Sequence, residues 1–182
     1  MTVAVTDKKQ KNPPDVIEVR VCVTEGVNIR TGPGVNYEKD STGQLVKGEE
    51  LYVLEERDGW IRFRCTPQDR GWSGWVNREF TVSKEEWDRA QEEAAIEEQE
   101  KAIKELTKAG LLVRINPDLN QAYVEPGIWH ALDYQAKEYI ARVMAFYRGR
   151  KKGTNLNWVD IKDRYSGKTL AKYSESWGFK VY

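Results

Sequence analysis

The chain has 182 residues, of which 40% are hydrophobic and 32% charged, and its 29 Lys and Arg side chains balance its 29 Asp and Glu side chains. This length allows one ordinary domain or two small ones, and the neutral total charge excludes an overall field that would select a partner. No apolar run approaches the ~18 residues of a membrane-spanning helix, and two cysteines are too few for a disulfide scaffold.

Residues 1–15 are predicted to form a flexible tail. They are mostly polar and include Asn12-Pro13-Pro14, a composition that does not build a packed element. The start of the chain also lacks the apolar core of a signal peptide. The compartment therefore stays open: the protein is cytoplasmic, or it belongs to the cell envelope or is secreted if a leader was removed before residue 1.

Residues 16–82 show the alternating pattern of short β-strands. Each apolar run is bounded by Gly, Pro or Asp, and Asp58-Gly59 is a strong hairpin-turn signal. A long loop over residues 31–42 separates two of the strands and carries Tyr37. Six short strands favour a small barrel, which removes its own exposed edges. The predicted strands are residues 17–23, 27–30, 43–46, 50–56, 60–65 and 74–77.

Three motifs in this segment resemble the bacterial SH3-like (SH3b) domain in their order and spacing, over residues 18–82. The motifs are Gly26-Val27-Asn28-Ile29-Arg30-Thr31-Gly32-Pro33-Gly34, Asp58-Gly59-Trp60-Ile61-Arg62-Phe63-Arg64 and Gly71-Trp72-Ser73-Gly74-Trp75-Val76-Asn77. The resemblance implies an SH3-like β-barrel that binds cell-wall peptides or other envelope ligands and does not catalyse a reaction. It also implies that Trp75 belongs to the packing of the barrel.

One face of this predicted barrel carries the candidate ligand-binding residues. Trp60 alternates with Ile61 and therefore shares the outer face with Arg62, and aromatic rings beside cations can hold a ligand. The alternative, that these side chains only clad the barrel, stays open because most protein surface is apolar in any case. The candidate lining consists of Arg30, Tyr37, Trp60, Arg62 and Trp72.

Residues 83–109 are predicted to form a charged connecting helix. Ser83 followed by Glu86 is a capping box, and Gly110 is a good stop signal. The middle of the helix is too polar to be buried, whereas Ile103 and Leu106 form an apolar seam near its end. The segment is therefore expected to be a semi-rigid spacer that docks at its C-terminal half.

Residues 110–182 are predicted to form a small α+β domain of unknown function. The pattern indicates a hairpin at residues 111–125, a helix ending near Arg148, a second hairpin over residues 157–173 and a closing strand. The economical arrangement is a four-stranded antiparallel sheet with one helix across it. The end of this segment resembles small uncharacterised bacterial proteins, which imply no activity.

A compact basic run follows the predicted helix. It comprises Arg148, Arg150, Lys151 and Lys152. Cations at this position complement the helix dipole, and the alternative is a patch for an anionic partner such as teichoic acid, lipid headgroups or nucleic acid. No DNA- or RNA-binding motif accompanies the run. Residues 84–109 have a net charge of −4 and residues 110–182 a net charge of +5, so these two segments could also attract each other.

Catalytic and metal sites find little support in the sequence. A thiol peptidase needs a thiolate beside a base, but both cysteines, Cys22 and Cys65, precede the only histidine, His130, and lie in the SH3b-like segment. Strand alternation puts Cys22 outside and Cys65 inside, which argues against a disulfide unless a bulge shifts the alternation. One histidine and two distant cysteines do not make a zinc site, and no cofactor motif is present. Carboxylate pairs such as Asp160 with Asp163, or Asp118 with Glu125, are more typical of a solubilising surface.

The leading hypothesis is a non-catalytic binding module, expected in the bacterial cell envelope, that holds a peptide or peptidoglycan stem on the aromatic and basic face of the barrel. The alternative is a cytoplasmic adaptor whose barrel and C-terminal domain build a protein-interaction surface. A hydrolase that uses acidic residues of the C-terminal domain is a third, weaker alternative.

Overall fold

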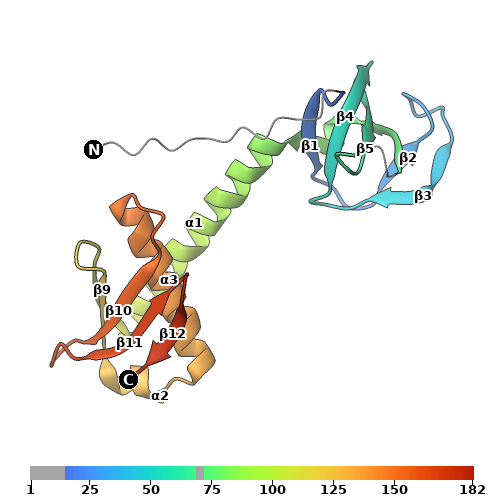
Figure 1. Cartoon of the computed structure of the whole chain (residues 1–182). Coiled ribbons are helices and arrows are strands. Elements are labelled where there is room, and N and C mark those ends of the chain that lie inside the picture. Colours follow the sequence, from blue (N-terminus) through green and yellow to red (C-terminus); the bar gives the residue numbers. More distant parts are fainter. Residues whose placement is uncertain (1–14, 69–71) are drawn as a thin grey trace, which may run out of the picture. The chain divides into compact units, whose positions relative to one another are not determined.

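A computed structural model describes residues 15–68 and 72–182 of the chain (Figure 1). The fold contains two β-sheets and three α-helices. It divides into two compact units, the first ending at Glu92 and the second beginning at Glu93. Of the tail predicted over residues 1–15, all but Asp15 lies outside the described residues.

The first unit contains a seven-stranded antiparallel sheet in the order β3-β2-β6-β5-β4-β1-β7. Within the described part of the chain, no pairing joins the edge strands β3 and β7, so a closed barrel is not seen and the SH3-like barrel remains a prediction. The short β7, which follows a 3-10 helix η1, was not predicted. The elements are β1 (Glu18–Cys22), β2 (Val27–Arg30), β3 (Lys39–Leu45), β4 (Glu50–Arg57), β5 (Trp60–Arg64), β6 (Ser73–Asn77), η1 (Arg78–Phe80) and β7 (Thr81–Ser83).

Alternate side chains of these strands build the core of the first unit. Register shifts in β2 and β4 are bulge-like irregularities that bend a strand and increase its twist. Cys22 was expected on the outer face, and this was wrong: both Val21 and Cys22 are 0% exposed, because β1 is covered on both of its faces. The core residues are Cys22, Val27, Ile29, Leu45, Leu51, Val53, Ile61, Phe63 and Val76.

The predicted connecting helix is confirmed as α1 (Lys84–Lys108). The backbone N–H of Glu86 donates to Ser83 Oγ at 3.1 Å, and the backbone N–H of Ser83 donates to Glu86 Oε2 at 3.0 Å, which is the reciprocal capping box. No residue of α1 is fully buried, but Ile103 and Leu106 pack against the core of the second unit. The helix therefore docks at its C-terminal end, as its sequence predicts.

The second unit contains a five-stranded sheet in the order β12-β11-β10-β9-β8. The expected four-stranded antiparallel sheet was wrong, because β10 pairs with β9 in parallel. The two helices between these strands carry the chain back along the sheet, so β10 starts at the same end as β9. The elements are β8 (Leu112–Asn116), β9 (Gln121–Val124), α2 (Pro126–Ala131), α3 (Tyr134–Lys152), β10 (Trp158–Asp163), β11 (Thr169–Ser174) and β12 (Gly178–Val181).

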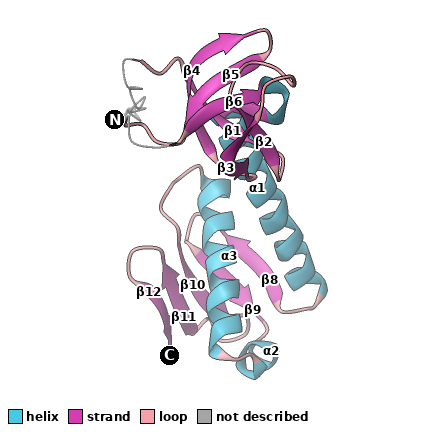
Figure 2. Ribbon diagram, turned by 90° about the vertical axis from the view of Figure 1, so that its right-hand side faces the viewer, coloured by secondary structure: helices cyan, strands magenta, loops and turns pink. Residues whose placement is uncertain are grey.

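Helix α3 lies across one face of this sheet and leaves the other face uncovered by helices (Figures 1 and 2). Asp133 caps its start by accepting from the backbone N–H of Ala136 at 2.7 Å. Gly153, with a φ of 68°, ends it in the left-handed conformation. Trp129 of α2, which is 0% exposed, packs into the core of the second unit. Among the described residues, the helices include none that is both long and apolar enough to cross a bilayer.

Candidate binding site

The strand register aligns an aromatic ring between two arginines on the outer face of the first unit's sheet. Arg30 of β2 lies opposite Trp75 of β6, and Trp75 lies opposite Arg62 of β5. Arg62 in turn lies opposite Glu55 of β4. Directly opposed residues of antiparallel strands share one face, so these four side chains form a continuous row across four strands. We call the set Arg30, Trp75, Arg62 and Glu55 the outer-face row.

Sequence reasoning named neither Trp75 nor Glu55 of this row as a site residue. Trp75 was assigned to barrel packing, and it is indeed buried, at 8% exposure. The core cluster that contains its neighbour Val76 does not include Trp75, so its ring packs on the outer face of the sheet. Strand alternation could have found it, because Ile61 and Val76 pair across β5 and β6 and both face inward.

The cations of the row are partly engaged by neighbouring groups. Arg62 Nε lies 3.3 Å from Glu55 Oε2, and the same carboxylate accepts from Arg57 Nη2 at 2.9 Å. Arg30 Nη1 donates to the carbonyl oxygen of Tyr37 at 2.9 Å. These are exposed contacts that water screens, so they orient the guanidinium groups without removing them from solvent.

Tyr37 and Trp60 flank the outer-face row. Tyr37 is 49% exposed, and its ring lies over Gly32, where any Cβ would overlap it. The hydrogen bond from Arg30 to the carbonyl oxygen of Tyr37 joins the loop that carries Tyr37 to the row. Trp60 is half-buried at the end of β5 and lies opposite Arg57 and Asn77. Four of the five predicted lining residues thus belong to the row or flank it.

Trp72, the fifth predicted residue, does not join this face. It packs against the core of the first unit, where its ring meets that of Phe63 edge-on at a centroid distance of 5.9 Å. An edge-to-face pair of this kind stabilises packing. Trp72 is therefore a poor probe of ligand binding, since its removal would disturb the fold.

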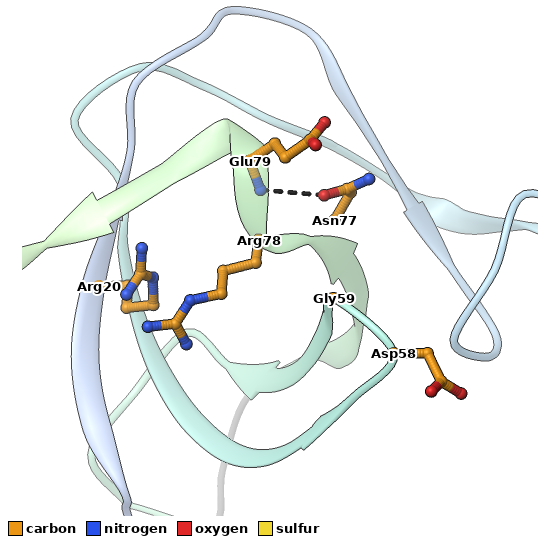
Figure 3. Close-up of a pocket in the computed structure, with 6 residues that line it drawn as sticks. All are labelled: Arg20, Asp58, Gly59, Asn77, Arg78 and Glu79. Carbon is orange, nitrogen blue, oxygen red and sulfur yellow. Dashed lines mark hydrogen bonds between the residues drawn. The ribbon is translucent and has the colours of Figure 1, made fainter.

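A separate open cavity of about 420 Å³ lies beside the Asp58-Gly59 turn (Figure 3). Arg20, which is 7% exposed, donates from Nε to Thr81 Oγ1 at 2.7 Å. Arg78 Nη1 donates to Glu18 Oε1 at 2.8 Å and to Glu56 Oε2 at 2.6 Å. Both guanidinium groups of the cavity are thus bound by the protein's own oxygens, and the cluster ties β1 to η1 and β7.

Both cysteines are free thiols of the first unit. Burial raises the pKa of the Cys65 thiol to about 12, and the nearby Glu49 carboxylate acts in the same direction. Burial also raises the pKa of Cys22. Neither is the low-pKa thiolate that a nucleophile requires. Over residues 15–68 and 72–182, the structure gathers no group of three or more His, Cys, Asp or Glu side chains that could hold a metal ion.

The predicted basic patch is divided by the structure. Arg148 is 1% exposed, donates to Asn120 Oδ1 at 2.6 Å and also binds the carbonyl oxygen of Leu156. Burial lowers its pKa, and it is withdrawn from any surface.

The other three cations of the patch remain near the surface but meet groups of the same unit. Arg150 and Lys151 lie 3.7 and 3.6 Å from Glu100 Oε1 of α1. Lys152 donates to the carbonyl oxygen of Asp118 at 3.1 Å. The acidic helix and the basic helix end thus attract each other, as their opposite charges allow.

No protein-family model, curated protein or solved structure matches this chain, so its function is inferred from its residues and their geometry.

Proposed function

We propose that this chain is a non-catalytic binding protein whose first unit, an SH3b-like barrel, holds a carboxylate-bearing peptide on the outer-face row. The alignment of Arg30, Trp75 and Arg62 across three neighbouring strands carries the proposal. Two interstrand spacings separate the arginines, which places their backbones about 10 Å apart. This spacing suits two carboxylate groups of one short extended peptide, with the indole between them.

The chemistry of the row fits a shallow and weak site. Guanidinium groups bind carboxylates through paired, charge-assisted hydrogen bonds, and Tyr37 and Trp60 extend the aromatic surface on either side. Glu55 already contacts Arg62, so a ligand carboxylate has to displace it. An open face that also orders its ligand gives modest affinity.

The resemblance to SH3b domains favours a particular peptide, the stem peptide of the bacterial cell wall, and with it a role in the cell envelope. A stem peptide offers carboxylates along an extended backbone, which matches the row. A protein partner that presents acidic side chains, as a cytoplasmic adaptor would bind, is the competing occupant.

Co-sedimentation with purified peptidoglycan sacculi tests the proposal. Arg62→Gln and Trp60→Ala, both on the outer face, are expected to lose most of the sedimented fraction. Lys47→Gln is the matched control, because Lys47 is an exposed cation in the turn between β3 and β4 and lies outside the row. Circular dichroism establishes that each variant is folded. If the wild-type protein stays in the supernatant, the wall-peptide proposal is wrong and the adaptor hypothesis gains.

A further inference from the structure

Figure 1 shows that the face of the second unit's sheet that turns away from α3 is not covered by a helix. The strand register places two polar rows on this face. The residues between them along the strands, such as Ala122, Ile161 and Ala171, belong to the core, so the alternate residues point outward. The first row crosses the sheet through Arg114, Tyr123, Lys162 and Thr169. The second row crosses it through Gln121, Asp160, Lys172 and Lys180.

Positive charge dominates this face. The rows contain four cations and one carboxylate, Asp160, whose oxygens lie 3.3 Å from Lys172 Nζ and 4.0 Å from Lys162 Nζ. Arg114 and Lys180 are exposed, and within the described residues neither has an acidic partner. One carboxylate cannot neutralise four cations, so the face attracts anions.

Aromatic rings are interleaved with these cations. The guanidinium carbon of Arg114 lies 4.0 Å from the centre of the Tyr123 ring. Lys180 Nζ lies 5.0 Å from the centre of the Tyr182 ring, and Tyr182 is 61% exposed.

We propose that this face binds single-stranded nucleic acid. Cations that track phosphates and aromatic rings on which bases stack are the two components of such a surface. The rows contain no aliphatic side chain, so the face lacks the apolar centre of a protein interface and the apolar wedge that enters a lipid surface. The sequence gives no nucleic-acid motif, because the rows form only when five strands are brought into register. The proposal concerns the second unit and does not rest on peptide binding by the first.

Fluorescence anisotropy with a labelled 20-nucleotide oligo(dT) or oligo(U) and the full chain tests this inference. Binding is expected to weaken steeply with salt, since single strands lose affinity with a logarithmic slope of about 0.7 per neutralised phosphate. Lys172→Ala combined with Lys180→Ala is expected to lower that slope by about 1.4. Tyr182→Ala is expected to weaken binding at least about fivefold, whereas Tyr182→Phe retains the ring and the affinity.

The matched control removes two cations from the end of α3. Lys151→Ala combined with Lys152→Ala is expected to change the affinity less than about twofold, because these residues lie outside the rows. Three results would each overturn the proposal: no binding by the wild-type protein, equal losses in the two double variants, or identical affinity in Tyr182→Ala. The last result, together with competition by polyphosphate, would reveal a site for phosphate alone.

Discussion

Replacing Gly74 by Ala tests the packing logic of the first unit. Gly74 lies opposite Phe63 on the core side of β6. A Cβ built there would come closer to Ile29 Cγ2 than the 3.0 Å that real Cβ atoms keep, and it would lie 3.2 Å from the carbonyl oxygen of Arg30. Ile29 is 0% exposed and β-branched, so it has little freedom to move away. Overpacking of this kind costs about 1–3 kcal/mol.

The two thiols provide an assay that reads the first unit alone, because the second unit contains no cysteine. Cys22 is 0% exposed and is alkylated only when the unit opens. A loss of 1–3 kcal/mol raises the labelling rate of the Cys22 peptide about 5- to 150-fold when opening and closing are fast. The rate is measured by mass spectrometry after pulses of iodoacetamide.

Gly127→Ala is the matched control for this experiment. Gly127 lies in α2 of the second unit, and a Cβ at this position meets no atom within 4 Å. This variant is expected to label Cys22 at the wild-type rate. An unchanged rate in Gly74→Ala would show that the core has room beside Ile29, and the packing argument would be refuted.

Three further predictions concern local interactions. Ser83→Ala removes one half of the capping box and is expected to destabilise α1 by about 1 kcal/mol, seen as lost helical signal in thermal circular dichroism. The hydrogen bond from Arg64 holds the pKa of Asp15 below its ordinary 3.8. Its contribution to stability is therefore present above that pH and is lost as the pH falls through the lower native pKa. Asp15→Asn is expected to be less stable than wild type at neutral pH, and urea titrations are expected to show this difference shrinking as the pH falls below 3.8. Arg148→Ala is expected to cost about 2–4 kcal/mol in urea unfolding, because it removes a side chain that is 1% exposed and leaves the acceptors on Asn120 and Leu156 without their donor. An undiminished midpoint would contradict this.

Strand and helix positions followed from local signals in the sequence. The capping box at Ser83 and the turn at Asp58-Gly59 are encoded by adjacent residues, so α1 and the β4–β5 hairpin were predicted closely. The parallel pairing of β9 with β10 depends on a crossover of more than thirty residues, and no local pattern specifies it. The first unit's second edge strand, β7, was missed because it is short and follows directly from η1.

The candidate site was predicted only in part, because local sequence signals do not specify which strands lie side by side. Alternation along one strand put Trp60 and Arg62 on a common face, but it did not reveal which residues lie beside them on other strands. Trp75 joins Arg30 and Arg62 only through register between β2, β6 and β5. Arg148 looked like a surface cation because its neighbours in sequence are charged, whereas its burial depends on Asn120, which is far away in the chain.

The parallel β9–β10 pair also determines the order in which the second unit can be completed during synthesis. The β8–β9 hairpin and the β10–β11–β12 meander each form from contacts close in sequence, but their junction requires that α2 and α3 first be in place. Until β10 has left the ribosome, one edge of β9 stays unpaired, and an unpaired edge is a site where chains aggregate.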